Sequence, residues 1–71
     1  MRHVKVQSEH IESVAYDPIS RDMEVKFKTN GSTYVHHGVP PQEHAAFLAC
    51  PSHGQYYHYN VKNVYPCDRV R

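Results

Sequence analysis

Apolar and charged side chains alternate along the segment MEVKFK, residues 23–28. A period of two is typical of a strand that buries one face, because successive side chains point to opposite sides of the backbone. The Asn30–Gly31 pair follows closely. These residues favour a two-residue hairpin turn, since both positions of such a turn need a positive φ. The pattern therefore predicts a β-hairpin whose second strand runs over residues 32–36.

The predicted turn fixes which residues of the two strands lie opposite each other. Counting outward from it places Phe27 opposite Tyr34 and Val25 opposite His36. Tyr34 and His36 then share the inward face of the hairpin. A partly buried His36 is expected to be neutral and hydrogen-bonded to a neighbour such as a tyrosine hydroxyl. If His36 instead lines a groove between the sheet and the helices, it is a ligand contact.

A third strand precedes the hairpin. Val14 and Tyr16 lie two residues apart before a loop that contains proline and serine. This pattern predicts a strand that pairs with residues 23–27, because consecutive strands are usually neighbours in a sheet. The result is a three-stranded antiparallel meander, whose apolar face needs a cover to be stable in water.

Two helices supply that cover. Residues 41–50 open with a proline and place alanine, phenylalanine and leucine at helical spacing. Ser52 is a suitable N-cap for a second helix over residues 53–63. The expected fold is therefore α+β, with one domain over residues 1–71 in which a three-stranded antiparallel β-meander carries two C-terminal α-helices packed on one face.

The second predicted helix carries tyrosines on two faces. Tyr57, Val61 and Tyr65 lie on one side, where they can hold the helix against the sheet. Tyr56 and Tyr59 lie toward the other side and share no obvious buried face. We therefore expect the first group in the core and the second group free to meet a partner.

Length and charge narrow the function. The chain has 71 residues, enough for one domain, and a net charge of +1 with neutral histidines, without the basic excess that most nucleic-acid binders carry. Its seven histidines raise that charge as the pH falls toward about 6. No segment resembles a signal peptide or is long and apolar enough to cross a bilayer. A cytoplasmic location without membrane contact is expected, with Cys50 and Cys67 as reduced thiols.

One ordered set of residues runs from Val6 to Tyr65. Its members are Ser8, Ile11, Val14–Asp17, Met23, Val25, Phe27, Gly31, Tyr34, Val39–Pro40, Phe47–Leu48, Pro51–Ser52, Gly54, Tyr56–Tyr57, Val61–Lys62 and Tyr65. Their order and spacing resemble the KTSC domain family, which is named after a C-terminal extension of some lysyl-tRNA synthetases. The family is also found as stand-alone small proteins of bacteria and phages.

The resemblance implies a small α+β domain and, through the link with lysyl-tRNA synthetases, a role in binding RNA. The central signature of the family is Tyr-x-Tyr, which reads Tyr34-Val35-His36 in this chain. An imidazole therefore stands where the second tyrosine is expected. Any role of that tyrosine passes to His36 or is lost.

The aromatic stretch that begins at Ser52 supplies most candidate binding residues. Tyrosines stack on unpaired bases, a lysine meets phosphates, and backbone N–H groups at a helix start attract anions. The predicted binding residues are Tyr34, His36, Ser52, His53, Gly54, Tyr56, Tyr59 and Lys62. They favour a small module that binds RNA or single-stranded nucleic acid weakly. One alternative is a protein-interaction or self-association module, since tyrosine is enriched at interfaces, and another is capture of a small anionic, nucleotide-like ligand at the helix start.

Metal binding and catalysis have little support in the sequence. Cys50 and His53 have a chelating spacing, and His36, His37 and Cys67 are further zinc-ligand types. A strand sends His36 and His37 to opposite faces, however, so only one of them can join a given site. A nucleophile such as Ser52 or Cys50 would need a base and a group that orients the base, and only His53 is near in the sequence. We therefore expect no metal, no cofactor and no enzyme activity.

Overall fold

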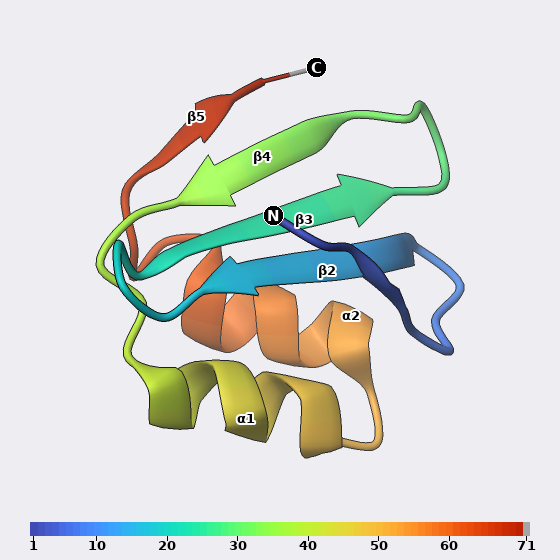
Figure 1. Ribbon diagram of the computed structural model, residues 1–71. Helices are drawn as coiled ribbons and strands as arrows, with labels where there is room; N and C mark the ends of the chain where they lie inside the picture. The colour runs from blue at the N-terminus through green and yellow to red at the C-terminus, as the bar shows by residue number, and fades with distance from the viewer. Residues whose placement is uncertain (71) are drawn as a thin grey trace.

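The computed structural model describes residues 1–70, and its helices cover one face of a sheet (Figure 1). The strands are β1 (Val4–Lys5), β2 (Ile11–Asp17), β3 (Asp22–Phe27), β4 (Thr33–His36) and β5 (Cys67–Arg69). The helical segments are α1 (Pro41–Ala49), α2 (His53–Tyr56) and η1 (Tyr57–Val61), a π-helical turn that continues α2. The α+β class and the placement of the helices on one face agree with the prediction.

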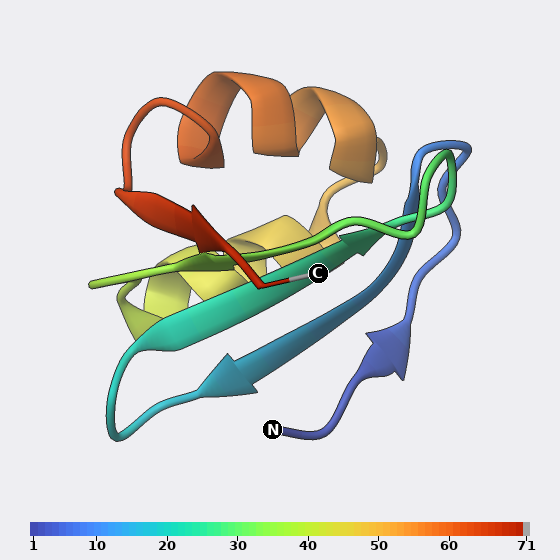
Figure 2. The same cartoon turned by 90° about the horizontal axis from the view of Figure 1, so that it is seen from above.

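The sheet has five strands in the order β1-β2-β3-β4-β5, each antiparallel to its neighbour. The predicted meander corresponds to β2, β3 and β4, so the prediction of three strands is wrong by the two edge strands. β1 has two residues and β5 has three, all of them exposed. Strands this short and exposed carry no apolar alternation for a pattern to detect. Figure 2 shows β1 and β5 at opposite edges of the sheet.

The β3–β4 hairpin pairs two residues away from the predicted register. Val25 lies opposite Tyr34, and Met23 lies opposite His36. Side chains alternate with a period of two, so a shift of two residues leaves every side chain on its predicted face. Tyr34 and His36 therefore still face inward with Val25 and Met23.

A longer turn explains the shift. The Phe27 N–H donates to the Ser32 carbonyl (2.9 Å), so residues 28–31 form the connection. Gly31 has a positive φ of 69°, whereas Asn30 does not, which rules out the two-residue turn predicted from this pair. The Asn30 side chain instead accepts a hydrogen bond from the Ser32 N–H (3.0 Å) and stabilises the wider loop.

The second helix departs from the predicted α-helix over residues 53–63. The Lys62 N–H donates to the Tyr57 carbonyl (2.8 Å), five residues back, which is the bond of a π turn. Ser52 occupies the N-cap position, but its hydroxyl makes no capping hydrogen bond, contrary to the prediction. α1 begins at Pro41 as predicted. Within residues 1–70, no helix has the length and apolar character to span a membrane.

The core lies between the inner face of the sheet and the helices. Phe47 of α1 is fully buried, as are Met23 and Val25 of β3. Tyr57 and Val61 anchor the second helix in the same cluster, as predicted. Because these two residues lie four apart on the helix, they present one face to the sheet. This packing fixes the helix and therefore the surfaces on either side of it.

Candidate functional site

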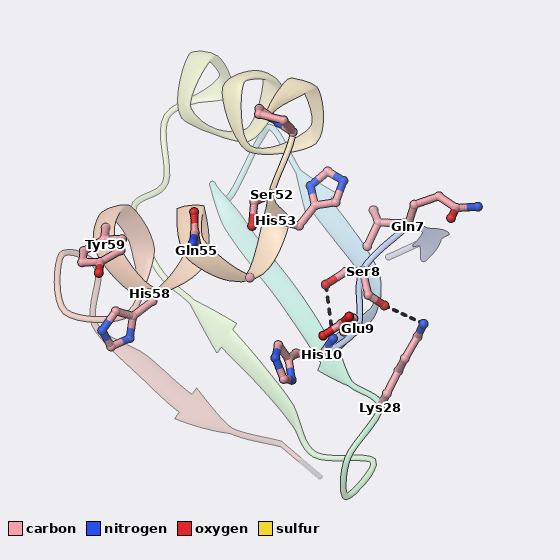
Figure 3. A pocket seen from close by; sticks show the side chains of 13 residues that line it. Gln7, Ser8, Glu9, His10, Lys28, Ser52, His53, Gln55, His58 and Tyr59 are labelled. Carbon is pink, nitrogen blue, oxygen red and sulfur yellow. Dashed lines mark hydrogen bonds between the residues drawn. The ribbon is translucent and has the colours of Figure 1, made fainter.

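A groove of about 910 Å³ separates the loop before β2 from the start of α2 (Figure 3). It is lined by residues 6–10, Lys28, residues 51–55, His58 and Tyr59, and is called the loop–helix groove below. Of the predicted binding residues, Ser52, His53, Gly54 and Tyr59 lie on its helical wall. The opposite wall comes from a part of the chain in which the sequence had not suggested a site.

The loop wall is held in place by hydrogen bonds to the β3–β4 hairpin. The Ser8 hydroxyl accepts hydrogen bonds from the N–H groups of His10 (3.3 Å) and Ile11 (3.2 Å) and closes a local turn. The Lys28 ammonium donates to the Ser8 carbonyl (2.6 Å), and the Lys28 N–H donates to the His10 carbonyl (2.8 Å). Figure 3 shows Lys28 reaching toward this loop. An ammonium group has three donors, so Lys28 keeps capacity for a ligand.

The helical wall is held by the end of α1. The Phe47 carbonyl accepts hydrogen bonds from the Cys50 thiol (3.0 Å) and from Nδ1–H of His53 (2.9 Å). These bonds satisfy a carbonyl that has no partner within its own helix. Because His53 Nδ1 carries the hydrogen, its Nε2 is left as an acceptor. His53 therefore has a structural role in joining the two helices as well as a place in the groove.

Cys50 and His53 do not form a metal site. Their Sγ and Nδ1 atoms are 3.6 Å apart, and both groups bond to the same carbonyl. Cys67, the other zinc-ligand type considered, lies in β5 and is a free, exposed thiol, while Cys50 is also free. Among the described residues, no cluster of three His, Cys, Asp or Glu side chains is arranged to hold a metal ion.

Tyr59 and the imidazoles give the groove its chemistry. The Tyr59 side chain is 74% exposed, and the His58 ring meets it edge to face with 5.0 Å between the ring centroids. The His10 ring lies close beneath the α2 backbone, since a Cβ built on Gly54 would stand 3.5 Å from its Cδ2. Gly54 lies within α2, and a side chain there would make an ordinary contact with the His10 ring. His10 and His58 are functional candidates that sequence reasoning missed, whereas Lys28 was already one of the lysines that could meet phosphates.

Tyr56 does not face a partner, so the prediction that it is free for binding is wrong. Its ring stacks on Phe47 with 5.7 Å between centroids and an interplanar angle of 25°. Desolvation by burial, together with the nearby Glu43 carboxylate, raises the pKa of the Tyr56 hydroxyl. Tyr56 is therefore one of the partly buried side chains that pack against the core.

His36 is fully buried and both of its ring nitrogens are bonded within the protein, so it has no polar group left for a ligand, which corrects its assignment as a binding residue. The alternative prediction is confirmed, because the imidazole is bonded to a tyrosine hydroxyl. Its Nδ1–H donates to the Tyr65 carbonyl (3.2 Å), and the Tyr57 hydroxyl donates to its Nε2 (2.9 Å). Burial lowers the pKa of His36 and raises the pKa of Tyr57 to about 12. Both groups are neutral at physiological pH.

Tyr34 and Lys62 lie in a second hollow, the hairpin–helix pocket, of about 560 Å³. Its walls are the end of the β3–β4 hairpin, the helical segment with the turn that follows it, His10 and Cys67. Gly54, His10 and His58 line both hollows, so the two meet around these residues. The structure therefore divides the predicted binding residues between two adjoining hollows.

Comparisons with known proteins agree with this architecture. The model of the KTSC domain matches residues 7–65. A protein of Tsukamurella paurometabola is 37% identical over 57 residues, covering 80% of this chain and 84% of the relative. A protein of Stutzerimonas stutzeri is 35% identical over 57 residues, covering 80% and 79%. The crystal structure of a KTSC domain protein from Yersinia pestis superposes with a TM-score of 0.93 at 31% identity, covering 99% of this chain and 97% of that one.

Proposed function

The chain belongs to the KTSC domain family, and we propose that it is a non-catalytic module that binds single-stranded nucleic acid, RNA foremost, in the loop–helix groove. The observation that carries the proposal is the exposed Tyr59 ring at a groove that also holds Lys28 and three imidazoles. An exposed tyrosine offers a face for a base to stack on, and cationic side chains nearby meet the phosphates.

The charge of the groove sets the strength of binding. Lys28 is opposed by Glu9, and the whole chain has a net charge of only +1. Few counterions are therefore released, so affinity is weak and falls with salt. α2 is four residues long, so its dipole is short and the anion contacts are assigned to side chains.

The groove gives no basis for catalysis. The Cys50 thiol and His53 Nδ1–H both donate to the Phe47 carbonyl, so these potential nucleophile and base groups serve to end α1. The His53 nitrogen near the thiol is Nδ1, 3.6 Å from Cys50 Sγ, and its hydrogen is directed to that carbonyl, so it is not placed as a base for this thiol. A cytoplasmic location belongs to the same proposal, because an exposed free thiol such as Cys67 suits a reducing compartment.

The proposal is tested by fluorescence anisotropy of a short labelled single-stranded RNA. We expect weak binding at low salt that falls further as the salt concentration rises. Tyr59→Ala should weaken binding about tenfold, since stacking on one ring contributes about 1–3 kcal/mol. Tyr59→Phe keeps the ring and should bind like the wild type. Val64→Ala removes another exposed apolar side chain and should also bind normally.

Binding that ignores salt and survives Tyr59→Ala would reject the proposal. A second function would then be favoured by the exposure of Tyr59 (74%) and Val64 (57%), namely a protein-interaction or self-association module. Sedimentation velocity over a range of protein concentrations measures self-association. A salt-insensitive dimer that Tyr59→Ala disrupts would support this second function.

A further inference from the structure

We infer that the hairpin–helix pocket receives one planar heterocyclic ring, the base of an unstacked nucleotide, with the Ser32 hydroxyl as a hydrogen-bond partner. The inference rests on the proposed function and deepens it. In this proposal the loop–helix groove binds the nucleic-acid strand, and the adjoining pocket binds one of its bases. Three features of the pocket support it: a buried hydroxyl without a partner, an aromatic wall and a polar rim.

The Ser32 hydroxyl is the first feature. The residue lines the pocket and is 2% exposed. Within residues 1–70, its Oγ is the one buried side-chain polar atom without a hydrogen-bond partner. Its backbone groups are already used, since the N–H donates to the Asn30 side chain and the carbonyl accepts from the Phe27 N–H. A buried hydroxyl without a partner costs free energy, which a bound polar atom would recover.

The aromatic wall is the second feature. Phe27, Tyr34 and Tyr57 line the same pocket as Ser32. Phe27 meets Tyr34 edge to face at 6.0 Å between centroids and meets Tyr57 edge to face at 5.2 Å. Such a wall gives a flat ring contacts with both faces and edges of aromatic side chains. An inorganic anion would gain nothing from this wall, and an aliphatic chain would leave the Ser32 hydroxyl unpaired.

The rim is the third feature. Thr29 and Asn30 of the β3–β4 connection line the pocket, as do Lys62 and Asn63 of the turn that follows η1. Together they offer the donors and acceptors that the edge of a base requires. His10 and His58, which line both hollows, connect the pocket with the loop–helix groove. A base can therefore enter the pocket while its strand follows the groove.

The test uses uncharged nucleosides, which carry the ring without phosphates. The ¹⁵N-labelled protein is titrated with adenosine, guanosine, cytidine and uridine at physiological salt, and the amides of Ser32, Tyr34 and Lys62 are followed. We expect shifts at these amides for at least one nucleoside. Ser32→Ala should weaken that binding about tenfold, the value of one hydrogen bond. Because this hydroxyl has no partner in the protein, the variant should be as stable as the wild type.

Thr33→Val is the matched control, because Thr33 is an equally buried neighbour on the opposite face of β4. It should bind nucleosides like the wild type. The inference fails if no nucleoside shifts the pocket amides, or if Ser32→Ala and the wild type bind equally well.

A short RNA and its analogue without bases distinguish this inference from the proposed function. If both bind equally in the loop–helix groove, the inference fails and the proposed function stands. If nucleosides bind the pocket but RNA does not bind the groove, the proposed function fails and the pocket is a small-molecule site.

Discussion

His36 is the residue at which this chain departs most clearly from the Tyr-x-Tyr signature expected of its family. A buried imidazole needs a partner for each ring nitrogen, and the Tyr57 hydroxyl and the Tyr65 carbonyl supply them. The two hydrogen bonds tie β4 to the helical segment and to the chain that follows it. The imidazole therefore forms a polar link in the core, with Nδ1–H as donor and Nε2 as acceptor.

The lowered pKa of His36 makes stability depend on pH. The unfolded chain takes up a proton at the ordinary value of 6.5, while the folded chain takes it up only at lower pH because the ring is buried. Between these values the unfolded state binds more protons, so the contribution of His36 to stability falls as the pH falls below about 6.5. Two-dimensional NMR of the imidazole rings measures the titration midpoint of His36 in the folded protein, which should lie below 6.5.

His37 is an internal control for that measurement. Its hydrogen bonds to Asp68 and Asp22 raise its pKa, so it should titrate above 6.5 in the same spectra. Its contribution has the opposite sign, being present below 6.5 and lost as the pH rises through its folded pKa. A His36 midpoint at or above that of His37 would contradict the assigned hydrogen bonding.

Tyr57→Phe tests the hydrogen bond to His36 directly. The variant keeps the ring in the core but leaves the buried Nε2 of His36 without its donor. We expect a loss of about 1–3 kcal/mol in the free energy of unfolding, measured by urea denaturation. Tyr59→Phe makes the same chemical change on an exposed ring and should leave the free energy of unfolding unchanged. Equal stability of the two variants would show that the Tyr57 hydroxyl contributes nothing.

Single residues also show where sequence reasoning succeeds. The neutral, tyrosine-bonded state of His36 could be predicted, because strand alternation alone decides which side chains face the core. The prediction that Tyr56 is free for a partner was wrong, because it considered the second helix against the sheet and not against Phe47 of α1. The π turn and the contact with Phe47 depend on tertiary packing that no local pattern contains.

At the scale of elements, Gly38 and Gly54 differ in whether the backbone conformation requires a glycine. Gly38 lies in the loop after β4 and has a φ of 75°. A Cβ added there would meet nothing within 4 Å. Gly54 lies in α2, and its added Cβ would make an ordinary contact with His10. Only the first of these positions requires glycine for its backbone conformation.

Two alanine variants form a matched pair for this distinction. Gly38→Ala should lower the free energy of unfolding by about 1–2 kcal/mol, because an L-residue is strained in the left-handed region. Gly54→Ala should raise it by up to about 1 kcal/mol, since alanine is the better helix former. Urea denaturation measures both. A Gly54→Ala variant less stable than Gly38→Ala would contradict the conformations assigned to α2 and the loop after β4.

Elements with strong periodicity were predictable and the others were not. The β3–β4 hairpin and α1 follow from their patterns and their turn or proline signals. The hairpin register was missed because Asn30 serves the loop through its side chain and not through a positive φ. β1 and β5 exist only because their backbones pair with β2 and β4, and their sequences give no sign of it.

At the scale of the whole molecule, one helical segment, α2 with η1, contributes residues to both hollows. Its packing through Tyr57 and Val61 sets the loop–helix groove on one side and the hairpin–helix pocket on the other. The helical wall of the groove was predictable, because Ser52, His53, Gly54 and Tyr59 were all named as binding residues from the sequence. The loop wall could not, because residues 6–10 reach the helix only through the fold of the entire sheet.

The central claim is that single-stranded RNA binds in the loop–helix groove, and an NMR titration of the ¹⁵N-labelled protein with a short RNA tests it most directly. At low salt we expect shifts at the amides of residues 8–10, 53–55 and 58–59, and their loss at physiological salt. The absence of shifts at low salt, or shifts confined to the outer face of the sheet, would contradict the claim.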